Sequence, residues 1–186
     1  MNEALKLENY NYDDYLEIDA TTQERLELIF GQIYMMAGAS ALHQDTVLNI
    51  ASLLKNIAKE QQKCTPRIAP FDVKLSINRQ INVVQPDVMI FCNNSSLPCA
   101  IFEVLSPSTA YKDKTIKKEL YEASGIEEYF LVNIEYKIID KFILQEGKYL
   151  YDKAYGVEDK LPILCMESEI ELSEVFEVGL ALPNDK

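Results

Sequence analysis

The sequence comprises 186 residues, 48% of them hydrophobic and 10% aromatic, a composition that excludes extended disorder away from the two ends. Its 18 basic and 30 acidic residues give a net charge of −12, so a nucleic acid would meet net repulsion unless basic residues cluster locally. We expect residues 1–10 to form a flexible arm and residues 11–186 to form a single domain with one continuous core.

The first predicted elements are a short helix over residues 11–19 and a β-hairpin over residues 24–40, hinged at Gly31-Gln32. Glu27 lies in the first strand of this hairpin, and alternation places it on the same side as Arg25 and Ile29. Two interpretations of Glu27 remain open. It is either a solvated carboxylate paired with Arg25 or an acidic residue of a functional site.

Residues 40–62 predict the longest helix, because apolar residues recur at three- and four-residue spacing. The helix carries the only histidine, His43, in its first turn. A single histidine cannot form a site of several histidines or of cysteines and histidines. A polar contact or a helix cap is the simpler interpretation of His43, and a catalytic role is the alternative.

A strand interrupted by Pro70 is predicted over residues 67–77, and a second hairpin follows it. Two apolar, strand-like runs, residues 83–91 and 98–104, are joined by a polar turn at residues 93–96. Each run contains one carboxylate, Asp87 in the first and Glu103 in the second. Burying an ionised carboxylate costs several kcal/mol unless a partner or a metal compensates it.

Fifteen residues separate Asp87 from Glu103, a spacing that lets the two side chains meet on one face of adjacent strands. Oxygen ligands without His or Cys suit a hard cation, Mg²⁺ or Mn²⁺. Such an ion can lower the pKa of a bound water and stabilise charge on a phosphoryl oxygen. The pair therefore indicates phosphodiester hydrolysis.

Start and stop signals, Pro107 and Gly125, bracket a helix near residues 111–123. On a helical wheel, Lys117 lies on the flank of the buried stripe and Lys118 points away from it. Lys117 is the candidate for a lysine near the metal, since Leu105 occupies the position on the strand of Glu103 where such a lysine would lie. A lysine snorkelling at the edge of the stripe is the equally weighted alternative.

Beyond Gly125, strands are predicted over residues 127–133, 137–144 and 148–155, followed by a closing strand and a final helical turn. One mixed sheet flanked by at least two helices accommodates all these elements, so the predicted fold class is α/β. The four cysteines, Cys64, Cys92, Cys99 and Cys165, show no CxxC pairing and no His partners at zinc spacing, so neither a zinc site nor a disulfide framework is expected. We interpret them as free buried thiols.

No signal peptide and no apolar run of about 18–20 residues is found in the sequence, so we expect neither secretion nor membrane insertion. A reducing cytoplasm fits these features best.

The combined motifs resemble a known family. They are Pro86-Asp87, the segment EVLSPST at residues 103–109, then Asp113, Lys117 and Tyr121 at four-residue steps, and Gly125. Together with Glu27 and Gly31 upstream, this pattern is similar to the Uma-type family of restriction endonucleases, within the PD-(D/E)XK nuclease superfamily.

The resemblance implies a restriction-endonuclease-like α/β core, a Mg²⁺- or Mn²⁺-dependent site and cleavage of DNA, with a homodimer expected. By the same resemblance, Asp87 and Glu103 are the metal ligands, Lys117 is the displaced lysine and Glu27 is an additional acidic residue. A catalytically silent binding or assembly module of the same fold is the main alternative. A nuclease acting on RNA or branched DNA is a further one.

Overall fold

The computed structural model describes residues 9–36 and 38–177. Of the arm expected over residues 1–10, only the last two residues fall within this range. Among the described residues, none of the helices combines the length and the apolar character needed to cross a membrane.

Three β-sheets form the framework of the part of the chain that the structure describes: six strands in the order β10-β9-β8-β7-β6-β3, four in the order β2-β1-β5-β4, and the pair β11-β12. The strands are β1 Leu26–Ile29, β2 Gln32–Met35, β3 Cys64–Ile68, β4 Val73–Ile77, β5 Gln80–Val84, β6 Val88–Cys92, β7 Ala100–Val104, β8 Glu128–Asn133, β9 Ile138–Gln145, β10 Lys148–Gly156, β11 Lys160–Ile163 and β12 Ser168–Glu171. In the six-stranded sheet, β7 and β8 are parallel and the other neighbours antiparallel. The predicted mixed α/β architecture is confirmed, but the expectation of one sheet is wrong.

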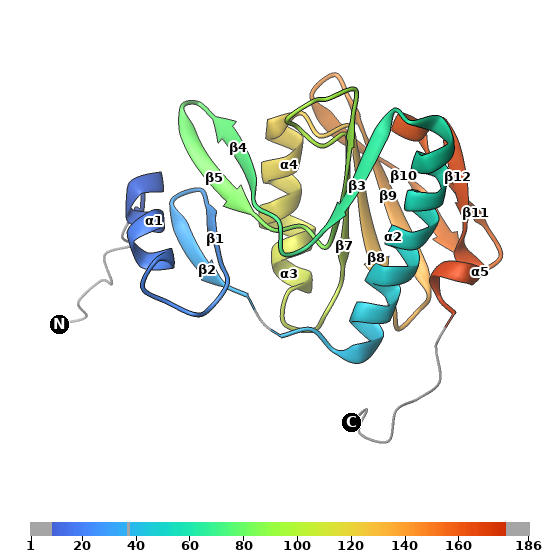
Figure 1. The fold of residues 1–186 in the computed structure, drawn as a ribbon, viewed down its shortest axis with the longest axis horizontal. Coiled ribbons are helices and arrows are strands. Elements are labelled where there is room, and N and C mark those ends of the chain that lie inside the picture. The colour runs from blue at the N-terminus through green and yellow to red at the C-terminus, as the bar shows by residue number, and fades with distance from the viewer. Residues whose placement is uncertain (1–8, 37, 178–186) are drawn as a thin grey trace.

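Within residues 9–36 and 38–177, seven helical segments connect or cover these sheets (Figure 1). They are α1 Tyr12–Asp19, α2 Ala41–Gln61, α3 Ala110–Lys112, the π-helical η1 Asp113–Lys117, α4 Lys118–Ser124, the 3₁₀-helical η2 Leu164–Met166 and α5 Leu172–Val175. The segments α3, η1 and α4 follow one another without a break. The helix predicted near residues 111–123 therefore exists, with a π turn in its middle.

Two prolines explain why the chain divides its strands between sheets. The run over residues 83–91 is not one strand, because β5 ends at Val84 and β6 begins at Val88. Pro86 lies in the gap, and proline cannot donate to a strand ladder. In the same way β3 and β4 lie on either side of Pro70, in different sheets. Asp87 is thus placed where the chain enters the six-stranded sheet.

The amino-terminal predictions hold with one small change. Asn11 caps α1, with its side chain accepting hydrogen bonds from the backbone of Asp13 and Asp14. The β1-β2 hairpin turns at Phe30 and Gly31, one residue earlier than predicted. Both turn residues have positive φ, 48° and 76°, and glycine meets this requirement without strain.

Helix α2 begins after Ser40, whose hydroxyl accepts a hydrogen bond from the backbone of His43, and ends at the left-handed Gln62. These are the predicted limits. Its buried side chains are Thr46, Ile50, Leu54 and Ala58. Leu48 belongs to the pattern of apolar residues that predicts this helix, yet it is 61% exposed. The apolar face of the helix is therefore narrower than the pattern predicts.

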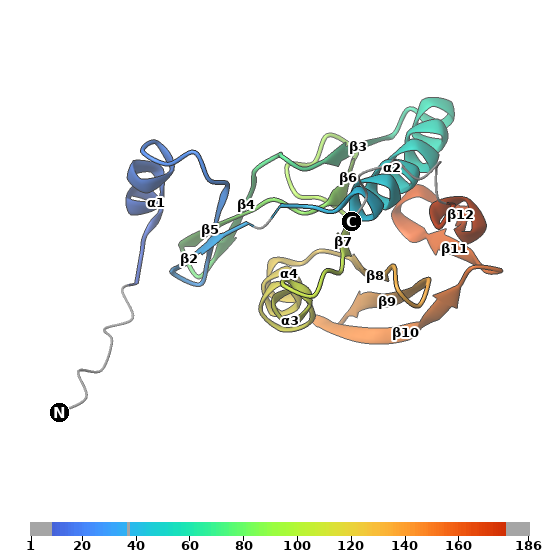
Figure 2. The same ribbon diagram turned by 90° about the horizontal axis from the view of Figure 1, so that it is seen from below.

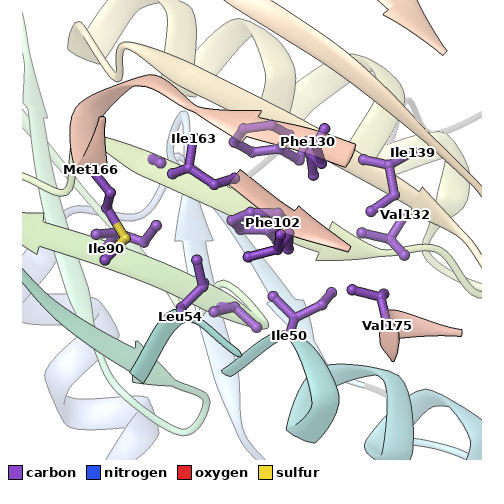
Figure 3. Close-up of a cluster of buried hydrophobic side chains, with 14 of the residues drawn as sticks. Ile50, Leu54, Ile90, Phe102, Phe130, Val132, Ile139, Ile163, Met166 and Val175 are labelled. Carbon is purple, nitrogen blue, oxygen red and sulfur yellow. The ribbon is translucent and has the colours of Figure 1, made fainter. Parts of the chain in front are cut away.

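The main core lies between α2, one face of the six-stranded sheet and the carboxyl-terminal segments from β11 to α5. Figure 3 shows Ile50 and Leu54 of α2 pointing toward Phe102, with Ile163 and Phe130 on its other side. Phe102 and Phe130, neighbours on the parallel strands β7 and β8, stack with their ring centroids 4.2 Å apart. Burial of these aromatic rings gives the core much of its apolar area.

The opposite face of the six-stranded sheet packs against α4, which also contacts β4 of the four-stranded sheet. Figures 1 and 2 show the helical run from α3 to α4 beside both larger sheets. Two positions differ from the helical wheel. The wheel that puts Lys117 on the flank of the buried stripe puts Ala123 within that stripe, but Ala123 is exposed. Lys118 does not point away but lies over the Phe142 ring, 4.0 Å from its centroid.

The structure joins Cys64 and Cys92 by a disulfide, so the interpretation of four free thiols is wrong for this pair. The two residues are directly opposite in the register of β3 and β6, with their Cα atoms 4.0 Å apart. Cys99 and Cys165 are free thiols. The pairing depends on which strands are neighbours, and the spacing of the cysteines carries no information about that.

A substitution of Phe102 by Ala tests the account of the main core. Phe102 is fully buried, so we expect Phe102→Ala to lower the free energy of unfolding by about 3–5 kcal/mol, as measured by urea denaturation. Leu150→Ala, at a side chain 51% exposed on β10, is the control and should change it by less than about 0.5 kcal/mol. A loss below about 1 kcal/mol in Phe102→Ala would contradict this account.

Candidate functional site

A cavity of about 1190 Å³ opens where the start of α2, the carboxyl end of β7 and the helical run α3-η1 meet. Four of the candidate residues, Asp87, Glu103, Lys117 and His43, line it. Glu27 is fully buried and contacts Lys117 directly. The structure therefore brings together the four residues expected at the site, which are Asp87, Glu103, Lys117 and Glu27. It adds His43 to them.

Asp87 and Glu103 face each other across the β6-β7 hairpin. Val88 is opposite Phe102 in the observed register, and continuing it by one residue places Asp87 opposite Glu103. Oδ2 of Asp87 accepts a hydrogen bond of 2.8 Å from the backbone N–H of Val104. The expectation that the two carboxylates share one face of adjacent strands agrees with this geometry.

Glu103 is buried, with 3% of its surface exposed. Its Oε1 accepts hydrogen bonds from the Lys117 ammonium at 2.9 Å and from the Tyr121 hydroxyl at 2.7 Å. Burial raises the pKa of Glu103 to about 8, although the Lys117 charge acts in the opposite direction. The carboxylate is thus compensated only in part by its protein partners.

The Lys117 ammonium lies between carboxylates from both larger sheets. Its Nζ is 2.8 Å from Glu27 Oε1 on β1, 2.9 Å from Glu103 Oε1 on β7, and 3.9 Å from Asp113 Oδ1. Burial alone would lower the pKa of Lys117, but these negative charges hold it well above its usual range. Because only 3% of the side chain is exposed, Lys117 is not a snorkelling lysine.

Glu27 is compensated by two lysines rather than by solvent. Lys112 Nζ lies 2.7 Å from Glu27 Oε2, and the backbone N–H of Gln85 donates to Oε1 at 3.1 Å. Burial would raise the pKa of Glu27, but the charges of Lys117 and Lys112 outweigh it and lower the pKa. The alternative of a solvated pair with Arg25 is wrong.

His43 reaches the site from the first turn of α2. Its Nε2 lies 3.2 Å from Asp87 Oδ2. Burial opposes protonation of His43, but the hydrogen bond and charge of Asp87 outweigh it and raise the pKa of the imidazole. Its other nitrogen, Nδ1, is buried without a hydrogen-bond partner among the described residues. His43 therefore makes a polar contact, one of the two simpler interpretations, and its partner is a candidate metal ligand.

Two further residues, Lys112 and Asp113, belong to the site although the sequence predicts neither as a ligand or catalytic group. Lys112, Lys114, Lys117 and Lys118 form a basic cluster that is typical of a solvated helix face, yet the Lys112 ammonium is held by Glu27 and lies 5.3 Å from the centre of the Tyr34 ring. Asp113 is buried, and burial raises its pKa. The four-residue steps from Asp113 to Tyr121 were a signal for Asp113, whereas Lys112 had no signal in the sequence.

The side chains at the site that could bind a metal ion offer oxygen atoms as ligands. The carboxylates of Asp87 and Glu103 could hold a hard divalent cation, and a bound cation would favour the ionised form of Glu103, which burial disfavours. In the described part of the chain, however, these carboxylates do not form a tight group of three ligand atoms. The one group of that kind consists of cysteines elsewhere.

The mixed sheet, with acidic residues at the β6-β7 hairpin and a lysine from the following helix, defines a protein of the restriction-endonuclease-like fold. The fold is similar to the crystal structure described as "a putative nuclease belonging to DUF820" from Anabaena variabilis, with a TM-score of 0.68 and 14% identity. That match covers 88% of this chain and 96% of the other.

The chain belongs to the Uma2 family, described as "Putative restriction endonuclease", which matches residues 12–183. Two proteins of Synechocystis sp. strain PCC 6803 are similar in sequence. The uncharacterised protein slr1290 is 30% identical over 178 residues, which cover 91% of this chain and 92% of the relative. The uncharacterised protein sll1609 is 33% identical over 131 residues, covering 64% and 72%. The family expected from the sequence motifs is thereby confirmed.

The pKa of Glu103 predicts a pH-dependent stability. Between the ordinary value of 4.5 and the folded value of about 8, the folded protein retains a proton that the unfolded chain has lost. The stabilisation from neutral Glu103 is therefore complete below about pH 4.5 and is lost as the pH rises through about 8. We expect the urea midpoint to fall more steeply from about pH 5 to about pH 8 in the wild type than in Glu103→Gln. Equal slopes in the two proteins would contradict this assignment.

Proposed function

We propose that this protein is a metal-dependent endonuclease, a hydrolase that cleaves phosphodiester bonds of DNA. The observation that carries the proposal is the buried Glu103, opposite Asp87 in a cavity and held by the Lys117 ammonium at 2.9 Å. Paired strand carboxylates with a nearby lysine suit hydrolysis of a phosphate ester, because they combine a place for a cation with a fixed positive charge. Membership of the Uma2 family supports the same reaction.

Asp87 and Glu103 are the proposed ligands of Mg²⁺ or Mn²⁺. Both are oxygen donors that line the cavity, and Asp87 keeps 17% of its side chain exposed. The bound cation would supply an acidified water and would stabilise charge on the phosphoryl oxygens. His43 and the backbone of Val104 hold Asp87 in place through Oδ2.

Lys117 is the proposed catalytic lysine. Lys117 lines the cavity, and its ammonium would orient the attacking water or offset the negative charge of the transition state. Glu27 is better described as a positioning residue, because it is buried behind Lys117 and fixes the ammonium through a contact of 2.8 Å. Tyr121 has the corresponding effect on Glu103.

The acidic character of the chain does not extend to the cavity. Its walls carry four basic residues, Arg25, Lys112, Lys114 and Lys117, against four acidic residues, Asp87, Glu103, Asp113 and Glu135. The local charge is therefore close to balanced although the chain carries −12. A homodimer, the proposed assembly, would present two such cavities to one DNA duplex and so increase the electrostatic attraction.

One observation favours a second candidate, a catalytically silent binding or assembly module. Lys117 and Tyr121 already occupy Oε1 of Glu103, and a carboxyl group with a pKa of about 8 is largely neutral near pH 7. A site in that state needs no cation to remain folded. The two candidates differ in whether the protein binds a divalent cation and cleaves DNA.

Substitution of the carboxylates separates the two candidates. We expect the wild type to nick supercoiled plasmid in the presence of Mn²⁺ or Mg²⁺, and Asp87→Asn and Glu103→Gln to lose detectable nicking because they lack a metal ligand. Lys117→Met should retain metal binding and cleave about 100- to 1,000-fold more slowly, since it lacks one stabilising charge. Excess EDTA should abolish cleavage by the wild type.

Glu158→Gln, which removes an exposed carboxylate beyond β10, is the matched control and should cleave like the wild type. Circular dichroism must show that every variant is folded. Each protein is also tested on RNA and branched DNA, because these are the alternative substrates. Equal cleavage by the wild type, Asp87→Asn and Glu103→Gln would exclude the proposed site.

A further inference from the structure

All four cysteines of the chain gather at one place, away from the proposed nuclease site. Cys64 begins β3, Cys92 ends β6, Cys99 immediately precedes β7 and Cys165 lies in η2. Asp87 stands directly before β6, so the five residues of that strand, about 16 Å in length, separate it from Cys92. Segments far apart in the sequence thus converge on a second cluster of ligand atoms.

The sulfur atoms are close enough to share one ion. Those of Cys92, Cys99 and Cys165 all lie within 4.8 Å of one another, and Cys99 Sγ is 3.4 Å from Cys92 Sγ. Cys64 is joined to Cys92 by the disulfide. The sulfur atoms of Cys64 and Cys92 also lie 3.8 Å and 3.7 Å from the carbonyl oxygen of Cys165.

The distances between the sulfur atoms are close to those in a tetrahedral zinc site. With metal–sulfur bonds of about 2.3 Å, the sulfur atoms around a zinc ion are about 3.8 Å apart. The sulfur atoms of Cys92, Cys99 and Cys165 already approach that separation. A single ion fits better than a cluster of several iron atoms, whose bridging sulfides would hold the cysteines further apart.

We propose that, in the reduced protein, Cys64, Cys92, Cys99 and Cys165 bind one zinc ion as a closed, structural tetrathiolate site. Soft thiolate ligands select Zn²⁺ over the hard Mg²⁺ or Mn²⁺ proposed for the carboxylates, so the two sites would not compete. The disulfide form lacks two of the four ligands. It would therefore not hold the ion.

The position of the cluster gives the ion a structural role. It would tie the start of β3 and the β6-β7 turn to η2, between the two strands of the β11-β12 pair. At present this pair is held near the main sheet by the apolar core and by hydrogen bonds from the backbone of Leu164 and Cys165 to Glu128. Cys165 also lines a surface hollow, together with Gln61 and Lys63.

Zinc binding requires prior reduction of the Cys64–Cys92 disulfide. A dithiol or phosphine reductant supplies two electrons, and with two protons it converts the Cys64–Cys92 disulfide into two thiols. One Zn²⁺ then replaces the protons of the four thiols, which are released to solvent. The zinc ion itself is neither oxidised nor reduced.

Cobalt titration of the full-length protein tests this site, because tetrahedral cobalt–thiolate centres have visible d–d bands and a near-ultraviolet charge-transfer band. After reduction with a phosphine, four thiols should be titratable and the bands should saturate at one Co²⁺ per chain. Addition of Zn²⁺ should abolish them. Absence of the charge-transfer band in folded protein with four free thiols would overturn the proposal.

Variants and redox state supply the controls. Cys99→Ser and Cys165→Ser should each weaken or shift the bands, whereas Asp87→Asn, at the far end of β6, should leave them unchanged. Protein oxidised with diamide, with the Cys64–Cys92 disulfide verified by mass spectrometry, should show no bands. Bands that persist in the oxidised protein would also overturn the tetrathiolate site. So would unchanged bands in both Cys99→Ser and Cys165→Ser.

Discussion

The buried ammonium group of Lys117 is the interaction on which the arrangement of this fold depends. It compensates Glu27 from the four-stranded sheet and Glu103 from the six-stranded sheet, and it comes from the helical run that packs between them. Removal of the ammonium would leave Glu103 with the Tyr121 hydroxyl as its remaining hydrogen-bond partner, and breaking a buried ion pair typically costs about 3–5 kcal/mol. The position of the helix and the relative position of two sheets are therefore linked through one cation, and the same cation faces the cavity.

Much of the site followed from local sequence signals. The Ser40 cap and the three- and four-residue spacing of apolar residues defined α2, and the polar turn between two apolar runs defined the β6-β7 hairpin. Alternation along these strands was enough to put Asp87 and Glu103 on one face. Their placement together depends only on a short hairpin, so no long-range information was needed.

The remaining features depend on contacts between segments far apart in the sequence. The π turn of η1 alters the helical register, so a wheel with regular α-helical spacing placed Lys117 on the flank although it is buried. Glu27 could not be assigned a partner, because Lys112 and Lys117 lie more than eighty residues away. The break at Pro86 was a visible signal, but which sheet each half would join depends on strand pairing. The same pairing brings Cys64 to Cys92.

Calorimetric titration of Mn²⁺ into the wild type and into Glu103→Ala tests the central claim most directly, with circular dichroism confirming that both proteins are folded. Mn²⁺ is a hard cation, so its binding reports on the carboxylates rather than on the cysteines. The account predicts that the wild type binds Mn²⁺ and that Glu103→Ala binds it at least ~10-fold more weakly, since it loses a ligand. Binding of equal affinity in both proteins, or no binding by the folded wild type, would contradict a metal site at the β6-β7 hairpin.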